Sequence, residues 1–431
     1  MKKIAIIGAG LAGLAAAVKL LTEGGDSVEV HLYEQSRFMG GRVSSFVEGT
    51  SGKLLDAVQH VSMKCCDATM RFLECTGLDV CGSFQKEIVF GGYRFSRLRN
   101  SPFLPAPFHL LGSVLRLKFL TFGQRLSLLA LTRRVQKETP PEDVSFSAWL
   151  ETLGCEKAIR RLFWDTLVLS AFSDSAENVP ARMAKNILTR MLMDRADGWH
   201  LWVPDRPLRM IFHDEMLRFL RKFPRFHFHP LTQIKRMPPE GDGIHDATIM
   251  AVPWHAAARI LPELTSRSIL KTECFVPRTI AAVHAWYDRP LFSPGRNVAI
   301  PGMTTQWIFR HPWGDADFPT SHGVYHQLML SDSDTCCSPR PEVIQNILTA
   351  ESQEMFPAAK LLHAKTVCVP ASVFSPAAAE HFRPKCVTPW RNIFLAGDWT
   401  DTGFPATMEG AIRSGETAAE VLNSECVIRN A

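Results

Sequence analysis

The chain has 431 residues, of which 46% are apolar, and its 48 basic and 43 acidic residues give a net charge of only +5. This length fits two or three domains, each with a core of its own, and so small a charge without a dense basic cluster argues against nucleic acid as a partner. No uncharged apolar run reaches the roughly eighteen residues that a membrane span needs, so any membrane contact is expected to be peripheral.

The cysteines favour a reducing compartment. There are eleven, an odd number, without a C-x-x-C motif, and the pairs at 65–66 and 336–337 lack the spacing of a metal or redox site. We therefore expect reduced thiols in a cytoplasmic protein and no metal site. Lys2 and Lys3 precede an apolar run as in a signal peptide, but regularly spaced glycines and Lys19 interrupt that run, which is expected to be the first strand and helix of the fold.

This first strand and helix have the pattern of a dinucleotide-binding turn. Residues 3–7 are an apolar, β-branched strand, and the turn into the helix of residues 14–23 fits G-x-G-x-x-G. In this motif the first glycine makes the bend, the second admits the pyrophosphate and the third lets the helix pack on the strand, while the helix N-terminus attracts the phosphates. The expected contacts to the dinucleotide are Gly8, Gly10, Leu11, Ala12 and Gly13.

A second strand, residues 28–33, ends in Glu34, whose carboxylate is placed to accept hydrogen bonds from the ribose hydroxyls of an adenosine. Gly40, Gly41 and Arg42 follow after a short interval. The stretch from Glu34 to Arg42 resembles the extended signature of flavoproteins of the amine oxidase and polyene desaturase superfamily. This resemblance implies FAD as the cofactor, with Gly41 and Arg42 near its phosphates.

The segment 108–137 is expected to form two helices that separate near Thr121, because Thr121 and Gln124 have the spacing of a capping box. The first of them is very apolar and includes Arg116 and Lys118. Two interpretations stay open: a core helix pair with solvated basic residues, or an entrance that leans on a membrane.

Two further strands are predicted in the second half of the chain, within residues 226–237 and 247–253, and both are expected to complete the nucleotide-binding sheet. Ile234 falls where the superfamily places a backbone contact to adenine.

Near the C-terminus the sequence again predicts a strand, a glycine turn and a helix. Residues 392–396 lead to Gly397 and Asp398, and the helix is expected to begin near Thr407 and Met408. An aspartate there can accept a hydrogen bond from a ribityl hydroxyl, and the dipole of the helix would stabilise the negative charge of a reduced flavin. The stretch also matches the "GD...MEGA...SG" motif of the same superfamily, so it is expected to hold the flavin half of the cofactor.

These units predict an α/β fold with a Rossmann-like FAD-binding domain of the amine oxidase and desaturase type. The domain is expected to be discontinuous, formed by residues 1–62, 210–265 and 386–431. The segments 63–209 and 266–385 are expected to form an inserted α+β substrate-binding domain.

Several segments resemble one family within the superfamily, the hydroxysqualene dehydroxylases of hopanoid biosynthesis, also described as squalene-associated FAD-dependent desaturases. Two departures from the family pattern are Val58, where the family has a glycine, and residues 173–177, where it has an asparagine with paired prolines. The resembling segments are residues 54–61, 104–111, 163–177, 203–212, 304–311 and 396–415.

The resemblance implies that hydroxysqualene is reduced to squalene, with a hydride passing from reduced flavin to an allylic carbon. The departing hydroxyl needs a proton, and His60 is the candidate donor, whereas Asp56 is expected to contact or position the cofactor. One dinucleotide fingerprint leaves no evident NADPH site, so an external electron donor or reductase is expected as a partner. The lipid substrate favours a location at the inner face of the cell membrane.

Three other functions stay open. An oxidative polyene desaturase of the carotenoid or phytoene type would use the same site with the hydride moving in the opposite direction. An amine oxidase is disfavoured, because Thr407 stands where many members carry an aromatic residue before "MEGA". A prenyl-binding chaperone of this fold would bind lipid without catalysis and would lack a working FAD site.

Overall fold

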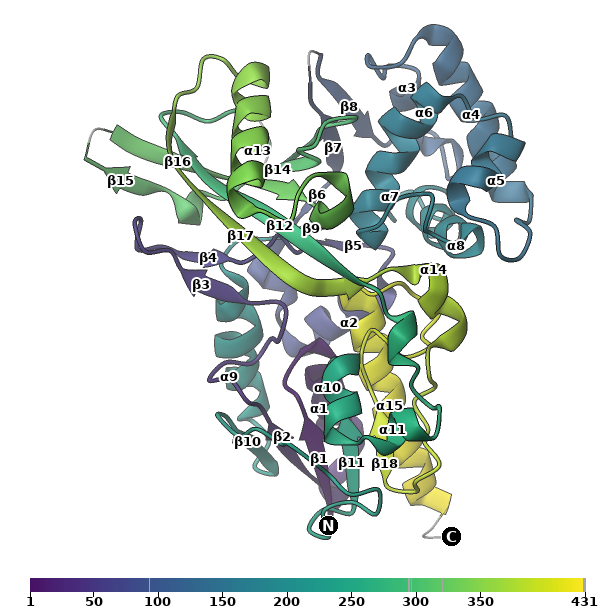
Figure 1. The fold of residues 1–431 in the computed structure, drawn as a ribbon, viewed down its shortest axis with the longest axis vertical. Coiled ribbons are helices and arrows are strands. Elements are labelled where there is room, and N and C mark those ends of the chain that lie inside the picture. The colour runs from purple at the N-terminus through teal and green to yellow at the C-terminus, as the bar shows by residue number, and fades with distance from the viewer. Residues whose placement is uncertain (93, 294, 296, 320, 429–431) are drawn as a thin grey trace.

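A five-stranded parallel sheet forms the half of the molecule that carries both chain ends (Figure 1). The computed structural model describes residues 1–428 except residues 93, 294, 296 and 320. Its strands come from three separate parts of the chain. A strand occurs in each of the five predicted places, but the one expected within residues 226–237 ends at His229, so Ile234 lies in the loop that follows. In spatial order its strands are β10 (Phe226–His229), β2 (Val28–Tyr33), β1 (Lys2–Ile7), β11 (Ala247–Met250) and β18 (Ile393–Leu395).

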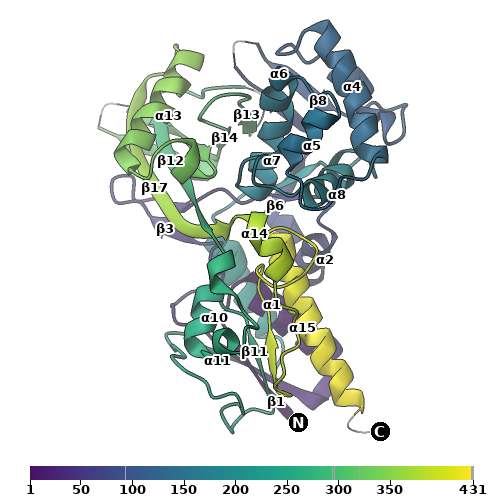
Figure 2. The ribbon, with the colours of Figure 1, turned by 45° about the vertical axis from the view of Figure 1, so that its right-hand side comes forward.

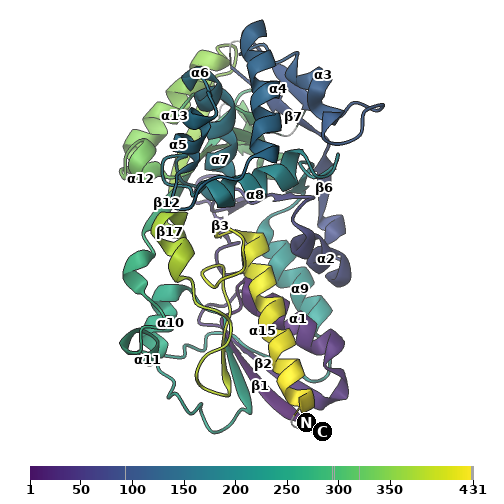
Figure 3. The ribbon, with the colours of Figure 1, turned by 90° about the vertical axis from the view of Figure 1, so that its right-hand side faces the viewer.

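Helices cover both faces of this sheet, as a parallel sheet requires. On one face, α1 (Leu11–Glu23) and α15 (Met408–Ile428) lie side by side and share a core with alternate residues of β2 (Figure 3). On the other face, α10 (Trp254–Ile260) and α11 (Glu263–Ser266) pack against β1 and β11 (Figure 2).

The other half of the molecule contains a mixed sheet and a group of helices. The spatial order of the sheet is β17-β12-β16-β14-β13-β7-β8, with β15 paired to β16. Its two long strands, β12 and β17, run down towards the parallel sheet (Figure 1). The strands are β7 (Glu87–Phe90), β8 (Ser96–Arg99), β12 (Pro277–Tyr287), β13 (Asn297–Ala299), β14 (Trp307–Arg310), β15 (Ala316–Phe318), β16 (Ser321–Leu330) and β17 (Leu361–Phe374).

The remaining elements connect or cover these sheets. A three-stranded sheet contains β5 (Ser62–Met63), β9 (Leu201–Pro204) and β6 (Gly82–Gln85), and a hairpin pairs β3 (Ser45–Val47) with β4 (Leu54–Asp56). The other α-helices are α2 (Asp67–Thr76), α3 (Leu111–Val114), α4 (Phe122–Lys137), α5 (Phe146–Thr152), α6 (Lys157–Ile159), α7 (Asp165–Phe172), α8 (Ala181–Leu192), α9 (Met216–Leu220), α12 (Ser333–Cys336), α13 (Pro341–Met355) and α14 (Pro376–Ala379).

The segment 108–137 contains two helices, as expected, but the first of them is short. The capping box is confirmed, because Thr121 and Gln124 exchange backbone-to-side-chain hydrogen bonds at the start of α4. The prediction of a long first helix is wrong, because α3 ends at Val114 and the chain then turns. The Arg125 guanidinium donates to the carbonyls of Leu115, Leu117 and Leu120, which replaces the hydrogen bonds that a longer helix would make. Among the described residues, no helix is both long enough and apolar enough to cross a membrane.

The division of the chain into two domains stays a prediction. One finding bears on its boundary: α2 lies in the segment assigned to the substrate domain, yet it contacts α15 and shares the core beneath α1.

Candidate functional site

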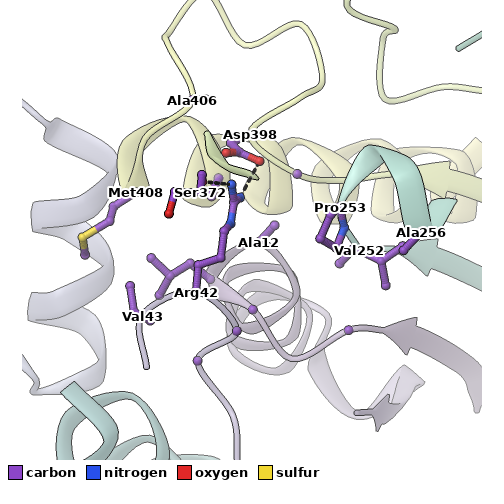
Figure 4. A pocket seen from close by; sticks show the side chains of 18 of the residues that line it. Ala12, Arg42, Val43, Val252, Pro253, Ala256, Ser372, Asp398, Ala406 and Met408 are labelled. Atoms are coloured by element: carbon purple, nitrogen blue, oxygen red, sulfur yellow. Dashed lines mark hydrogen bonds and ion pairs between the residues drawn. The ribbon is translucent and has the colours of Figure 1, made fainter. Parts of the chain in front are cut away.

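A cavity of about 720 Å³ lies where the carboxyl ends of the parallel strands meet the second half of the molecule. Parallel α/β sheets bind their ligands at this edge. Gly8, Glu34 and Asp398 follow three of the strands and form the floor of the cavity, whereas Ile280 on β12 and Ser372 on β17 form part of its roof. Figure 4 shows side chains from these distant segments converging on the cavity.

The turn between β1 and α1 is built from glycines that cannot carry a side chain. Gly8 has φ +103°, and a Cβ there would lie 2.5 Å from the carbonyl oxygen of Ala251. A Cβ at Gly13 would lie 1.9 Å from the carbonyl oxygen of Gly8, so Gly13 permits close packing of the helix and does not line the cavity. Gly10, Leu11 and Ala12 do line it. The start of α1 therefore faces the cavity with the backbone N–H groups that have no partner within a helix.

Glu34 is held at the end of β2 by backbone donors. The N–H groups of Ala9 and Ser36 donate to its two carboxylate oxygens, at 2.8 and 2.9 Å. Each oxygen retains a lone pair for another donor, as the expected ribose contact requires. Ile234 lines the same end of the cavity, where the adenine contact was expected.

The loop of Gly40, Gly41 and Arg42 closes over the glycine turn. The N–H of Gly40 donates to the carbonyl of Ala9 at 2.8 Å, and Gly41 has φ +59°. A Cβ on Gly41 would lie 3.0 Å from the Cα of Gly10, so these two glycines face each other across a narrow passage. The loop therefore packs directly against the glycine turn, and a side chain on Gly41 would not fit between them.

Arg42 bridges the N-terminal and C-terminal parts of the site. Its guanidinium forms an ion pair with Asp398 at 2.6 Å and donates to the carbonyl of Ser372 at 2.7 Å (Figure 4). Asp398 is almost fully buried, while Arg42 retains about a third of its exposure towards the cavity. Two residues that were predicted separately as cofactor contacts therefore also contact each other.

The C-terminal turn and helix take the predicted form. Gly397 has φ +146°, and its N–H donates to the Ser414 hydroxyl at 2.7 Å. The Thr407 hydroxyl accepts a hydrogen bond from the N–H of Gly410, as a helix N-cap does. Thr407 and Met408 both line the cavity, so the positive end of α15 points into it, opposite the start of α1.

Glu409 of the same motif has a structural role. Its buried carboxylate accepts hydrogen bonds from the N–H groups of Ala68 and Thr69, from the Thr69 hydroxyl and from Arg413. It thereby joins the start of α15 to the start of α2.

His60 lies in the cavity wall as a neutral imidazole. Its Nδ1 lies 3.1 Å from the carbonyl oxygen of Val58, which can only accept, so Nδ1 carries the proton. Burial, with a smaller contribution from Arg42, lowers the pKa of His60 to about 4. The other ring nitrogen is therefore a hydrogen-bond acceptor at neutral pH. The proton-donor role stays a prediction, and it requires the small protonated fraction of His60.

Asp56 does not line the cavity. It is buried at the end of β4, where it accepts hydrogen bonds from the Ser45 hydroxyl of β3 at 2.6 Å and from the N–H of Leu208 at 2.8 Å. Burial raises its pKa to about 7, although both hydrogen bonds act in the opposite direction. That Asp56 contacts or positions the cofactor stays a prediction, and the residues that follow it, from Val58 to Val61, line the cavity.

The two departures from the family pattern both lie at the cavity. Val58 lines it with a backbone φ outside the positive range, so a glycine is not required there. Ser173 also lines it and has φ +51°, and the next residue, Asp174, forms a buried ion pair with Arg278 at 3.2 Å. This ion pair joins the end of α7 to the base of β12.

Several residues of the site carry no motif that could have revealed them. They come from β12, β17 and α7, and they reach the cavity only through the pairing of the mixed sheet and the packing of its helices. These roof residues are Ser170, Ala171, Ile280, Ser372 and Val373.

The cavity fits an FAD molecule by the chemistry of its wall. The glycine turn and the start of α1 suit a pyrophosphate, Glu34 suits the adenosine ribose, and Asp398 with the start of α15 suits the ribityl chain and the flavin ring. Its volume lies in the range of cofactor pockets. The fold and the site together define a dinucleotide-binding flavoprotein.

A family model described as flavin containing amine oxidoreductase matches residues 11–423. The chain belongs to this family, and it is an FAD-dependent oxidoreductase.

Similar proteins extend over the whole chain. The hydroxysqualene dehydroxylase of Rhodopseudomonas palustris is 25% identical over 445 residues, which cover 98% of each chain. The zeta-carotene desaturase of Zea mays is 25% identical over 490 residues, 96% of this chain and 82% of that one. The crystal structure of an oxidoreductase from Methanosarcina mazei has a TM-score of 0.71 at 17% identity, covering 97% of this chain and 100% of that one. The predicted fold class and the resemblance to hydroxysqualene dehydroxylases are confirmed.

Proposed function

We propose that this oxidoreductase removes the allylic hydroxyl of hydroxysqualene and replaces it with hydrogen to give squalene. The observation that carries the proposal is the character of the cavity wall above the predicted flavin position. This part of the wall combines the aliphatic residues Val58, Val61, Ala171, Ile280 and Val373 with the uncharged polar residues Gln59, Ser170, Ser173 and Ser372, and His60 is the titratable side chain among them. The hydroxyls of Ser170 and Ser372 donate to backbone carbonyls. A largely aliphatic wall without a charged side chain and with one imidazole suits a hydrocarbon that carries a single hydroxyl, and full-length similarity to hydroxysqualene dehydroxylases supports the same substrate.

The reaction requires three changes at one carbon. The carbon–oxygen bond breaks, the oxygen leaves as water after receiving a proton, and a hydride equivalent adds to the allylic carbon. Bound FAD in its reduced form would supply that hydride equivalent. We propose that Glu34, Arg42 and Asp398 hold the cofactor, together with the glycine turn. The aliphatic side chains of the wall would limit the access of water, which would otherwise trap a carbon that becomes cationic as the hydroxyl leaves.

His60 is the proposed partner of the hydroxyl. Its acceptor nitrogen is able to orient the hydroxyl while the imidazole is neutral, and its protonated form is able to donate to the departing oxygen. Because the pKa is about 4, only a small fraction is protonated at neutral pH. The proton transfer is therefore expected to be faster at lower pH.

A polyene desaturase is the second candidate, since zeta-carotene desaturases match nearly the whole chain as well. It would use the same cavity wall with the hydride moving from substrate to cofactor. The product distinguishes the two functions, because a desaturase adds a double bond to an acyclic polyene and needs no hydroxyl.

We further propose that the region around α3 and α4 contacts a membrane surface from which the substrate enters. Large apolar side chains are exposed there, including Phe103, which is 90% exposed, and Phe122, which is 64% exposed. Arg116 and Lys118 lie between them in the sequence, and basic residues favour contact with anionic lipids.

A Phe103→Ser and Phe122→Ser double variant should lose binding to anionic vesicles in co-sedimentation. A Val80→Ser control, at a residue 71% exposed, should keep it.

The decisive experiment is anaerobic incubation of the FAD-loaded enzyme, after photoreduction, with hydroxysqualene. Mass spectrometry should detect squalene in amounts that match the reduced flavin. Oxidised enzyme with the same substrate should give none. Failure to form squalene with the reduced enzyme would refute the proposal, and new double bonds in an acyclic polyene with the oxidised enzyme would establish the desaturase instead.

The electron donor is proposed to be external. Stopped-flow mixing of the pure oxidised enzyme with NADPH under anaerobic conditions should bleach the flavin slowly or not at all. Rapid bleaching would contradict this part of the proposal.

A further inference from the structure

Four histidines lie close together on one face of the parallel sheet, at the edge strand β10 and its neighbour β2. Side chains alternate along a strand, so Glu29, His31 and Tyr33 of β2 lie on the face opposite the buried residues that pack against α1. On the edge strand β10, His227 and His229 share this face, and His227 is the direct register partner of His31. The loop that follows β10 adds His245, whose side chain is buried.

We propose that Glu29, His31 and His227 form a binding site for a divalent transition-metal ion of the zinc class. The Oε1 atom of Glu29 lies 2.8 Å from Nε2 of His227 and 3.4 Å from Nε2 of His31. All three atoms lie within 4.8 Å of one another. Zinc bonds of about 2.0–2.1 Å in a tetrahedral arrangement place ligand atoms roughly 3.3 Å apart, so the three atoms need little adjustment.

A second observation in favour of an ion concerns Nε2 of His31, the ring nitrogen on the side of Glu29 and His227. Nε2 of His31 is buried and has no hydrogen-bond partner among the described residues. A buried polar atom in that state is costly unless something binds it. A metal ion between His31, His227 and Glu29 would use this atom directly.

A further histidine supports His31 in the way that metal ligands are usually supported. The other ring nitrogen of His31, Nδ1, lies 3.1 Å from Nε2 of His229. When Nδ1 donates to His229, the lone pair of His31 Nε2 is free to bind the ion, and the ring is held in place. His229 in turn stacks on Tyr33, at 4.5 Å between ring centroids.

The groups around the site complete a polar network. His245 lies 5.1 Å from His31 between ring centroids, and its own nitrogens contact Asp242 at 2.6 Å and the Tyr33 hydroxyl at 3.3 Å. His227 is 40% exposed, which gives an ion a path from solvent. Two histidines and one carboxylate leave a fourth position for water, as three-ligand zinc sites do.

The position of the site suggests what the ion does. It would join the edge strand β10 to β2, and the segments that follow these two strands carry Ile234 and Glu34 to the adenosine end of the cavity. Binding is therefore expected to stabilise the nucleotide-binding sheet. The spacing of the cysteines predicted no metal site, and the histidines were not identified because His31 and His227 meet only through the register of the sheet.

The test uses the full chain with FAD bound, after treatment with a chelator and dialysis. Isothermal titration with Zn²⁺ should give one site per chain, and bound Zn²⁺ should raise the melting temperature. Co²⁺ should give the visible absorption of a tetrahedral site without the charge-transfer band that thiolate ligands produce. The absorption spectrum of bound Co²⁺ separates this site from binding by the free cysteines.

Variants then identify the ligands. Glu29→Gln and His227→Gln should each weaken Zn²⁺ binding by about 100-fold or more, and His229→Gln, which removes only support, by about 10–100-fold. The matched control is His322→Gln. His322 is exposed and contacts Asp317, and both lie far along the chain from the proposed ligands. It should bind as the unaltered protein does.

Three results would overturn the proposal: no saturable binding of Zn²⁺, binding that survives in Glu29→Gln and His227→Gln, or a thiolate charge-transfer band with Co²⁺. Because His227 is partly exposed, its variant is expected to fold, and retained FAD absorbance verifies this. Binding of Zn²⁺ and binding of FAD are separate measurements, and both are independent of which substrate the enzyme reduces.

Discussion

Replacing Gly415 by alanine should separate two helices that meet at the cofactor. Gly415 lies on α15 where that helix crosses α1, and a Cβ at this position would lie 2.0 Å from the carbonyl oxygen of Ala12. It would also lie 2.9 Å from the carbonyl carbon of Ala12 and 3.0 Å from the backbone nitrogen of Ala16. All of these neighbours are helix backbone, which cannot rotate away as a flexible side chain would.

The size of the effect follows from this geometry. Carbon and oxygen atoms in contact are about 3.5 Å apart, so the helices must move apart by more than about 1 Å. Overpacking of this kind costs about 1–3 kcal/mol in a well-packed core, and α1 and α15 share the buried residues Ala16, Ile412 and Ala418. Because both helices also begin at the cavity, we expect FAD binding to weaken by at least about tenfold, which corresponds to about 1.4 kcal/mol.

The assay compares Gly415→Ala with Gly123→Ala. A Cβ at Gly123, near the start of α4, would have no other atom within 4 Å, so this control adds the same methyl group without a clash. FAD affinity is measured by titrating the apoprotein and following flavin fluorescence, and stability by urea unfolding of the same samples. Equal FAD affinity and equal unfolding midpoints for the two variants would refute the reasoning.

Three other changes give distinct results. Glu409→Gln should lower the free energy of unfolding by about 3 kcal/mol in urea titrations, because an amide nitrogen replaces one carboxylate oxygen and cannot accept the two hydrogen bonds that this oxygen accepts. His60→Gln should slow squalene formation by about 10²–10⁴-fold in single-turnover assays, and in the unaltered enzyme the rate should fall about tenfold per pH unit above the pKa of about 4. The melting temperature of Asp56→Asn, measured relative to that of the unaltered protein, should rise as pH increases from about 4 to 7.

The sign of the last prediction follows from proton binding. Burial raises the pKa of Asp56 from 3.8 to about 7, so the folded protein keeps a proton that the unfolded chain has already lost. Stability of the unaltered protein therefore falls across this range, by at most about 4 kcal/mol at about 1.4 kcal/mol per pH unit, and asparagine removes the titration.

A different result would contradict each of the predictions for Glu409, His60 and Asp56. The control for Glu409 is Glu420→Gln, since the Glu420 side chain is 59% exposed, and equal urea midpoints for the two variants would contradict a structural role for Glu409. A rate that is independent of pH in the unaltered enzyme would remove His60 as the proton donor. Parallel melting curves for Asp56→Asn and the unaltered protein across this pH range would show that Asp56 does not titrate as expected.

The sequence predicted those parts of the site whose geometry is local. Gly8 to Glu34 is a continuous strand, turn, helix and strand, so the spacing alone placed the glycines and the carboxylate. The C-terminal motif placed Gly397 to Met408 for the same reason. The helix expected before Thr121 is shorter than predicted, because a side chain of the following helix, Arg125, donates to carbonyl groups that a longer helix would use.

The roof of the cavity and the histidine cluster could not be predicted in this way. Ser372 reaches Arg42 only after β17 has paired along β12. His31 and His227 face each other only because of the register between β2 and β10. Local sequence patterns contain no information on such pairings.

The close contact between α1 and α15 also has a consequence for biosynthesis. α1 is complete at Glu23, whereas the helix that covers it begins at Met408. During translation the apolar side of α1 therefore leaves the ribosome long before its partner exists, and the nascent chain must keep it from aggregating in the meantime. The edge strand β18 and α15 are made long after the other strands of this sheet, so the flavin end of the cavity is complete only once they have been made. In a preparation of this protein, a yellow colour would report that β18 and α15 have folded into place.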